Sequence, residues 1–543
     1  MSSPARAAPP LPVWAARGGA VLAGLAAAFA HPPWGLLPGL LGYAALLRLC
    51  DDAGPVRPLR SAFFRGWLTG AAYFAVSTWW IGEAFYVDAK DQAWMAPFAV
   101  ALMAAGLALF WGAAAALYRV LAPRGAGRLL VFAGALTGCE WLRGHLFTGF
   151  PWDLPGETWR AGSAVSQVAS LVGAYGLTWI TLAVAAAPGL GWRGLGWRGS
   201  GPRWAIGAAA LALAGAYAFG AWRLDHAQTA PAPGAPLVRI VQPDTAETAQ
   251  TPDALARILK RYLDLSTQPA ARRPDVIVWS EQGLPAALGD YLASGTWTEA
   301  AIQAALQPGQ TLITGGFRVA PAPPGAYAPD GVLYFNSLVA LRRDAAGLAM
   351  TALYDKHRLT PFGEYLPLGR YLAPLGVQQL VHVGQGFSPG PVPRPVATPG
   401  LPAFQPLICY ESLFPGFTRD GARLAGRRPA WIVNLSDDAW FGVTSGPWQH
   451  LNLASYRAIE EGLPMVRATP TGVSAAIDAY GRPLPGKLLT EDASGVIDVV
   501  LPPSLAPTPF ARAGGAPLVI LLLASAAFMF QNRHATLRHN GEA

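Results

Sequence analysis

The amino-acid sequence predicts two kinds of structure in one chain, a multi-span α-helical membrane domain of about eight helices and an α/β layered domain. Hydrophobic residues make up 52% of the chain and charged residues only 13%, whereas about 25% of the residues of a typical soluble domain are charged. Long apolar runs fill the first part of the chain and recur at its end, and shorter strand-like and helix-like segments alternate between them. We therefore expect transmembrane helices 1–7 in residues 1–228, the α/β domain in residues 229–508, and a last transmembrane helix with a tail in residues 509–543.

The apolar runs have the composition of membrane spans, and most have the length of about 20 residues that a helix needs to cross the hydrocarbon core. The first run resembles a secretory signal, but further apolar runs follow at once, so we interpret it as a retained span. The second and last runs are short and carry prolines or glycines, which leaves a buried or re-entrant helix as the alternative for each. The runs are Val13–Ala30, Trp34–Leu49, Ser61–Ile81, Ala93–Leu121, Leu129–Phe147, Val165–Leu190, Trp204–Trp222 and Ala513–Phe530.

The charges beside these runs predict the orientation of the chain. One alternating set of loops is rich in arginine, and the other set mixes few basic residues with aspartate and glutamate. Because cytoplasmic loops carry an excess of Lys and Arg, we expect both termini in the cytoplasm and residues 223–508 outside, in the periplasm of a bacterium with an outer membrane. The arginine-rich set contains Arg6, Arg17, Arg48, Arg57, Arg60, Arg65, Arg119, Arg124, Arg128, Arg193, Arg198, Arg203, Arg533 and Arg538.

An acidic and a basic residue stand together near the outer end of the fifth apolar run. Glu140 and Arg143 are spaced so that they lie on one face of a helix, where they can pair and share the cost of leaving water. We favour a structural ion pair, and a role in substrate binding is the alternative.

The composition argues against a nucleic-acid partner, a disulfide framework and a metal site. The formal net charge is +8, but the arginines are scattered singly between apolar runs and do not form a basic segment. The cysteines Cys50, Cys139 and Cys409 stand far apart, and the histidines lack the spacing of metal ligands. Cys50 and Cys139 lie in or beside apolar runs, where we expect them to be packing residues.

After the Pro/Ala-rich linker Thr229–Pro236, the pattern changes to short strands alternating with helices, which is typical of an α/β domain. We expect helices at Pro252–Thr267, Phe414–Leu424 and His450–Glu461. We expect strands at Leu237–Gln242, Val276–Trp279, Thr311–Phe317, Leu333–Leu341, Met350–Tyr354, Phe404–Cys409, Trp431–Leu435, Met465–Ala468, Val473–Ile477 and Val496–Val500.

Three segments of this domain carry residue types that catalysis uses. Asp275-Val-Ile-Val-Trp-Ser-Glu281 places a carboxylate after a buried strand, and Leu407-Ile-Cys409-Tyr-Glu places a thiol after another. Tyr354-Asp-Lys-His-Arg-Leu-Thr-Pro-Phe-Gly-Glu-Tyr-Leu-Pro367 places an ammonium group after a third. Strand ends are where α/β folds gather the groups that bind ligands. The three segments therefore predict one shared site.

Together the three segments resemble the Glu-Lys-Cys triad of the nitrilase superfamily, and the combination with membrane spans resembles the apolipoprotein N-acyltransferase family. Further segments match that family's pattern, namely Asp438–Gly442, Gly446–Leu451 and Arg457–Glu460. The resemblance implies a nitrilase-like αββα sandwich on a multi-pass protein of the bacterial inner membrane. It also implies a phospholipid as acyl donor and the N-terminal amine of a diacylglyceryl-cysteine apolipoprotein as acceptor. No cofactor is implied, and we expect a monomer.

The chemistry of acyl transfer assigns a role to each triad member. A thiol is mostly protonated at neutral pH, so Cys409 needs a base before it can attack an ester carbonyl, and Glu281 fits that role. Lys356 can stabilise the oxyanion that the attack creates. The resemblance implies substrate-binding or supporting roles for further residues, with salt bridging or plain packing as the alternatives. These residues are Glu364, Tyr410, Glu411, Trp440 and Phe441.

Two rival functions and four departures from the family pattern remain open. The same triad in a membrane-tethered carbon-nitrogen or ester hydrolase would deliver the thioester to water, and a non-catalytic membrane scaffold would need no triad. Apolar residues near the motifs, among them Phe362, favour transfer, because a covered thioester meets little water. The departures from the family pattern concern substrate contacts and not the triad. They lie at Asp244, Thr251, Asp437 and Pro470.

Overall fold

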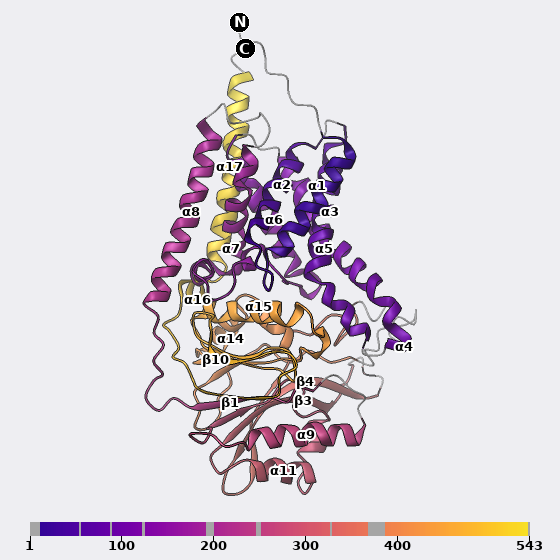
Figure 1. Cartoon of the computed structure of the whole chain (residues 1–543), viewed down its shortest axis with the longest axis vertical. Helices are drawn as coiled ribbons and strands as arrows, with labels where there is room; N and C mark the ends of the chain where they lie inside the picture. Colours follow the sequence, from indigo (N-terminus) through magenta and orange to yellow (C-terminus); the bar gives the residue numbers. More distant parts are fainter. Residues whose placement is uncertain are drawn as a thin grey trace. The chain divides into compact units, whose positions relative to one another are not determined.

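The computed structural model of the chain describes residues 11–53, 56–86, 89–121, 125–191, 200–245, 251–325, 328, 330–367 and 386–540. Figure 1 shows their helices and strands, which belong to two compact units. One unit holds Met1–His226 with Thr508–Ala543, and the other holds Ala227–Pro507. Of the arginines that predict the orientation, Arg6, Arg124, Arg193 and Arg198 lie outside the described residues.

The first unit is helical, and a helix lies within or overlaps each predicted apolar run. Three segments of the described chain, Ala93–Leu121, Val165–Leu190 and Arg203–Asp225, are long and apolar enough to span a membrane, and Val13–Phe29 and Ala516–Phe528 are shorter apolar helices. The helices are α1 (Val13–Phe29), α2 (Leu41–Asp51), α3 (Pro58–Ser77), α4 (Ala89–Gln92), α5 (Ala96–Leu121), α6 (Arg128–Arg143), α7 (Ala169–Ala186), α8 (Ser200–Asp225), α16 (Pro509–Ala513) and α17 (Ala516–Asn540).

The second apolar run forms a short buried helix, which was the alternative for that run. It divides into a 3₁₀ turn over Leu37–Leu40 and the 11-residue helix α2. Pro38 lies in the first turn of the 3₁₀ segment, where its missing N–H costs no helical hydrogen bond. Most of α2 is buried, and it packs against α1 and α7. At 1.5 Å per residue α2 is about 16 Å long, too short to cross the hydrocarbon core alone.

Small residues let the helices of this unit approach closely, as is common between membrane helices. A Cβ atom on Gly66 of α3 would stand 2.5 Å from the main-chain oxygen of Trp111 in α5, so only glycine fits there. The buried Trp111 indole donates a hydrogen bond to Glu140 Oε1 at 2.6 Å. Arg143 Nε donates to Glu140 Oε2 at 3.1 Å, and both side chains are fully buried. The predicted pairing of Glu140 with Arg143 is therefore present in the structure.

The second unit contains two sheets. The six-stranded sheet has the order β11-β1-β2-β3-β4-β5, and the five-stranded sheet has the order β10-β9-β8-β7-β6. Strands β1, β2 and β3 run parallel, as do β6, β7 and β8. The strands are β1 (Leu237–Gln242), β2 (Val276–Val278), β3 (Thr311–Pro321), β4 (Val332–Arg343), β5 (Leu348–Asp355), β6 (Phe404–Ile408), β7 (Trp431–Leu435), β8 (Met465–Ala468), β9 (Ser474–Ile477), β10 (Pro483–Leu489) and β11 (Gly495–Val500).

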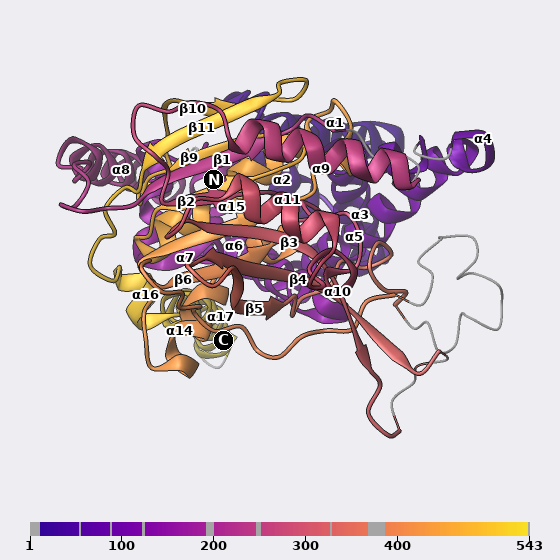
Figure 2. The ribbon, with the colours of Figure 1, turned by 90° about the horizontal axis from the view of Figure 1, so that it is seen from below.

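Helices cover the outer faces of both sheets, which makes the unit a four-layered αββα sandwich, the fold that the resemblance implies. The six-stranded sheet is covered by α9 (Pro252–Ser266) and α11 (Trp297–Ala305), and the five-stranded sheet by α14 (Phe417–Ala425) and α15 (Gly446–Glu461), as Figure 1 and the view from below in Figure 2 show. A fifth helix, α10 (Leu288–Tyr291), is short.

The period of two along each strand separates the two apolar layers of this sandwich. Val276 and Val278 of β2 belong to the core between the sheets, together with Val433 of β7. Ile277, between them in sequence, belongs to the core under α9 and α11, where it joins Leu259 and Ile302. A strand that is buried on both faces reads as a continuous apolar run, which is why Val276–Trp279 was predictable as a short buried strand.

The predicted strands are confirmed with small shifts of their ends, and three described elements of this unit, β10, α10 and α11, were not predicted. Strand β3 continues to Pro321, and its last residues pair with the start of β4. Strand β10 contains two prolines and a glycine, residues that favour turns, and it forms an edge strand with a bulge. Helix α11 is only 9 residues long and begins at the N-cap Thr296, whose hydroxyl accepts from Glu299 N. Short elements of this kind carry little periodicity.

Candidate functional site

The three predicted triad members follow strands of the two facing sheets. Lys356 comes directly after β5, Cys409 directly after β6, and Glu281 three residues after β2. The ends of these strands contribute to one apolar cluster between the sheets. Because the strand ends are held together by that core, the three side chains lie in electrostatic contact with one another.

Lys356 forms the centre of a buried charged cluster. Its Nζ atom lies 3.2 Å from Glu281 Oε1 and 2.9 Å from Glu364 Oε2. The Glu364 carboxylate also accepts a hydrogen bond from the main-chain N–H of Thr360 at 2.7 Å, which holds it in place. The structure therefore brings Glu364 into the same cluster as Glu281 and Lys356.

Asn336 in β4 joins the two carboxylates and is absent from the sequence prediction. Its Nδ2 atom donates to Glu281 Oε1 at 2.7 Å and to Glu364 Oε1 at 2.6 Å. Its main-chain oxygen accepts from the N–H of Lys356 at 2.8 Å. The only local signal for Asn336 is one amide side chain beside Ser337 in a largely apolar strand, and that signal does not identify a partner.

A close main-chain approach keeps Glu281 in position. A Cβ atom on Gly315 of β3 would lie 1.8 Å from the Glu281 carbonyl oxygen, so this position of the strand requires glycine. The segment after β2 stays bonded to β3 through Leu284 N, which donates to Gly315 O at 3.0 Å. Glu281 Oε2 has no hydrogen-bond partner among the described residues, although it is buried. That oxygen is free to accept a proton.

The charges of the cluster decide which group carries the proton. Burial would lower the pKa of Lys356, but the carboxylates of Glu281 and Glu364 outweigh it and raise that pKa, so Lys356 stays cationic. Burial raises the pKa of Glu281, while Lys356 opposes the rise. Burial, followed by the charge of Glu281, raises the pKa of the Cys409 thiol. The resting nucleophile is therefore a neutral thiol that needs a base at the moment of attack.

Cys409 has a backbone conformation that few residues with a side chain adopt. Its φ is +47°, in the left-handed region. It opens a 3₁₀ turn over Cys409–Leu413, and Glu411 of that turn accepts a hydrogen bond from Ile408 N at 2.9 Å. Glu411 Oε1 also accepts from the Tyr354 hydroxyl at 2.7 Å and from His357 N at 2.8 Å. Glu411 thus links the end of β5, next to Lys356, to the nucleophile.

The aromatic residues of the prediction occupy different environments. Tyr410 is buried, with its ring edge-to-face against Phe414 at a centroid distance of 5.2 Å. Phe441 is also buried and packs edge-to-face on His450 at 5.5 Å. Trp440 is 39% exposed, and Phe362 is 53% exposed. No hydrogen bond or cation–π contact joins Trp440 to a triad member among the described residues, so its predicted role stays a prediction.

The four departures from the family pattern are accommodated locally. Thr251 is the N-cap of α9, and its hydroxyl accepts from Ala254 N at 3.3 Å. Asp244 has a φ of +55° and accepts from the Thr471 hydroxyl. The Asp437 carboxylate accepts from Ala439 N. The carbonyl of Pro470 accepts from Thr245 N, so residues near Asp244 and Pro470 lie side by side.

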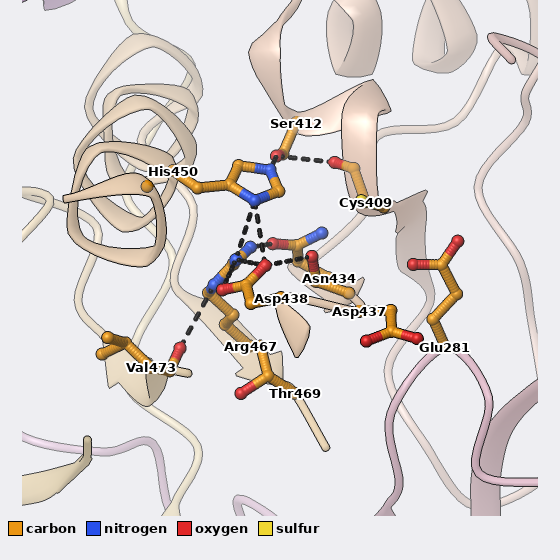
Figure 3. Close-up of polar contacts among 12 residues, drawn as sticks. Glu281, Cys409, Ser412, Asn434, Asp437, Asp438, His450, Arg467, Thr469 and Val473 are labelled. Carbon is orange, nitrogen blue, oxygen red and sulfur yellow. Dashed lines mark hydrogen bonds and ion pairs between the residues drawn. The ribbon is translucent and has the colours of Figure 1, made fainter. Parts of the chain in front are cut away.

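A second buried polar network lies beside Cys409 and is also absent from the sequence prediction. Figure 3 shows Ser412 between the main chain of Cys409 and the ring of His450. Asp438 and Arg467 continue the network on the other side of that ring. Asp438 and His450 lie in segments that match the family pattern, but the sequence alone predicts no role for either of them.

Family models match both parts of the chain. Residues 23–187 match the model described as the apolipoprotein N-acyltransferase N-terminal domain, and residues 237–508 match the carbon-nitrogen hydrolase model. The second match spans the αββα unit with all three triad positions.

Curated relatives match nearly the whole chain. An apolipoprotein N-acyltransferase of Caulobacter vibrioides is 52% identical over 94% of this chain and 94% of its own length. Those of Bradyrhizobium diazoefficiens and Rhodopseudomonas palustris are each 38% identical, over 96% and 93% of this chain and 95% and 92% of their own lengths. This degree of identity along the full length, with both family models in order, shows that the chain belongs to the apolipoprotein N-acyltransferase family.

Proposed function

We propose that this protein transfers an acyl chain from a phospholipid to the N-terminal amine of diacylglyceryl-cysteine apolipoproteins, through a thioester on Cys409. The observation that carries the proposal is the buried Lys356 that contacts Glu281 and Glu364 beside a thiol at a strand end. Membership in the N-acyltransferase family supports the identity of the substrates.

The first half-reaction forms the thioester. Glu281 accepts the proton of the Cys409 thiol while the sulfur attacks the ester carbonyl of the phospholipid. The new C–S bond leaves negative charge on the carbonyl oxygen, and the Lys356 ammonium group stabilises it. When the tetrahedral adduct collapses, its C–O bond breaks and Glu281 returns the proton to the leaving alcohol. The products are acyl-Cys409 and a lysophospholipid.

The second half-reaction forms the amide. The neutral α-amine of the lipoprotein attacks the thioester carbonyl, and Glu281 accepts a proton from the nitrogen. Lys356 again stabilises the oxyanion, and collapse breaks the C–S bond. The sulfur leaves with the proton held by Glu281, which restores the neutral thiol. The balance requires no metal, redox partner or cofactor.

The acceptor distinguishes this reaction from hydrolysis by the same triad. Phe362 and Trp440 expose apolar surface on the α/β unit, which supports contact with lipid. We expect purified enzyme, supplied with phospholipid and a diacylglyceryl-cysteine peptide, to add one acyl chain to the peptide amine and release lysophospholipid in equal amount. Mass spectrometry measures both products, and a reaction without peptide is the control. Free fatty acid formed at one rate with or without peptide, with no amide, would identify a hydrolase instead.

We also propose a multi-pass protein of the inner membrane with both termini cytoplasmic and the α/β unit in the periplasm. The arginines beside the apolar helices support this orientation. Fusions of a compartment-sensitive reporter at Pro233 and at His539 should therefore report opposite sides of the membrane. Equal signals from the two fusions would contradict the orientation without affecting the assignment of the triad.

A further inference from the structure

The main chain around the nucleophile is held by residues that do not belong to the triad. The hydroxyl of Ser412 donates a hydrogen bond to the main-chain oxygen of Cys409 at 2.8 Å (Figure 3). Ser412 is fully buried and lies in the 3₁₀ turn that Cys409 opens. On the other side of Cys409, Glu411 of the same turn holds the N–H of Ile408. The carbonyl group of Cys409 and the N–H group of the preceding residue, Ile408, are therefore both held by side chains of one turn.

The position of Ser412 is in turn set by three buried residues of the five-stranded sheet and its helix. His450 Nε2 of α15 lies 3.1 Å from Ser412 Oγ, and His450 Nδ1 lies 3.0 Å from Asp438 Oδ1. Arg467 of β8 donates to both oxygens of Asp438 at 2.8 and 2.7 Å and lies 3.1 Å from His450 Nδ1. Because these residues follow or belong to different elements, the network connects the Cys409 turn to the sheet beneath it.

One arrangement of protons satisfies the chain from Arg467 to Cys409. The Ser412 hydroxyl has a single hydrogen, which lies between two acceptors, the Cys409 main-chain oxygen at 2.8 Å and His450 Nε2 at 3.1 Å. Burial and the charge of Arg467 lower the pKa of His450, which keeps a single proton on the ring. The ionised carboxylate of Asp438 can only accept, so that proton lies on Nδ1 and is donated to Asp438 Oδ1, while the guanidinium of Arg467 donates to both oxygens of Asp438. Burial would raise the pKa of Asp438, but Arg467 and His450 lower it to about 2, so its carboxylate stays ionised.

The backbone conformation of Cys409 indicates what this network does. A φ of +47° is uncommon for a residue with a Cβ atom and persists only where the surrounding structure enforces it. Ser412, His450 and Asp438 are arranged in the order of a serine-protease triad. Ser412 is fully buried and donates to the main chain, so its hydroxyl is occupied and shielded from substrate. The geometry instead suits an anchor.

We propose that Ser412 and His450 are positioning residues that hold Cys409 in its left-handed conformation and so align its thiol with Glu281 and Lys356. The inference rests on the proposed role of Cys409 as nucleophile. A misplacement of about 1 Å at a reacting atom can lower a rate about 100-fold. Loss of the anchor should therefore lower the rate of thioester formation while leaving the binding of phospholipid unchanged.

The test compares two serine variants of the full-length protein in detergent with a labelled phospholipid. Ser412→Ala is expected to lower the single-turnover rate of thioester formation about 10- to 100-fold, with KM for phospholipid near the wild-type value. Ser455→Ala is the matched control, because Ser455 is a buried serine of α15 whose hydroxyl donates to Leu451 O at 2.7 Å, within its own helix. The control should keep the wild-type rate.

A second pair of variants tests the histidine. Glutamine keeps a polar side chain that can hydrogen-bond to the Ser412 hydroxyl, whereas alanine cannot. We therefore expect His450→Gln to retain most of the rate and His450→Ala to fall as far as Ser412→Ala. The double variant Ser412→Ala/His450→Ala should be no slower than Ser412→Ala, because both substitutions remove the same anchor of Cys409.

Each result decides a separate point. Equal rates for Ser412→Ala and Ser455→Ala, or a change confined to KM, would overturn the positioning role while leaving the proposed function intact. If Ser412→Ala loses its cooperative thermal transition, the comparison of His450→Gln with His450→Ala decides, and equal rates overturn the role. Thioester label that persists in Cys409→Ala would instead refute the nucleophile, and with it the proposed function.

Discussion

Replacement of Cys409 by alanine should abolish both the thioester and the transfer of the acyl chain. The Cys409 thiol lies at the strand end beside Glu281 and Lys356. The methyl group of alanine cannot form a covalent intermediate. Loss of a nucleophile from a catalytic triad lowers kcat on the order of 10⁶-fold, which places the variant below detection. The measurement is the appearance of hydroxylamine-sensitive label on the protein after incubation with phospholipid that carries a labelled acyl chain.

The chain offers two matched controls for this variant. Cys50→Ala and Cys139→Ala remove the same atom from cysteines of the helical unit, both of which are buried. Each should still acquire the label and acylate the peptide, because neither belongs to the charged cluster. Label that remains on Cys409→Ala, or label that disappears equally from a control, would refute the assignment of Cys409.

Replacement of Lys356 by methionine should have the next largest effect. Methionine keeps most of the apolar stem and removes the ammonium group, which is the one cation paired with Glu281 and Glu364 in the part of the chain that the structure describes. Loss of one oxyanion-stabilising donor typically lowers kcat about 10²- to 10³-fold. Breaking a buried ion pair also destabilises a fold by about 3–5 kcal/mol, so thermal unfolding must be measured beside the rate. Lys260→Met is the matched control, because Lys260 is exposed and pairs only with exposed Asp264.

The pH dependence of the same variant separates loss of charge from loss of fold. Glu281 acts as base only when it is ionised, so the rate falls as the pH drops through its pKa. Burial already raises the pKa of Glu281, and Lys356 is the neighbour that opposes this rise most strongly. Without Lys356 the pKa rises further, and the acid limb of the rate profile should move to higher pH. An acid limb that stays in place, or a rate equal to that of Lys260→Met, would show that Lys356 does not act on Glu281.

Local patterns in the sequence were sufficient for much of the α/β fold. Strand β2 is readable because a strand buried on both faces is an uninterrupted apolar run, and the residues that follow it mark its end. The candidate triad positions were predictable because each follows a predicted strand and because the three segments together resemble the nitrilase-superfamily motifs. Strand β10 escaped prediction because its prolines and glycine are turn residues, and only pairing with β9 makes that segment a strand.

The structure of the helical unit was likewise predictable only in part from the sequence. Apolar length alone identifies the segments of α5, α7 and α8 as long enough to span a bilayer. The second run looks like a span by composition, and only the packing of α2 against α1 and α7 makes it a short buried helix. The pairing of Glu140 with Arg143 was predictable because both residues lie on one helix, whereas the hydrogen bond from Trp111 of α5 to Glu140 was not.

The sequence alone determined which residue types stand at which strand ends, and so the class of chemistry that Glu281, Lys356 and Cys409 can perform. Only the tertiary structure decided what holds them. Asn336 bridges two carboxylates from a different strand, and His450 reaches Ser412 from a helix 38 residues further along the chain. Such hydrogen bonds depend on strand register and on how helix and sheet pack. A local pattern of residue types contains neither, so these partners emerge only once the two sheets are assembled.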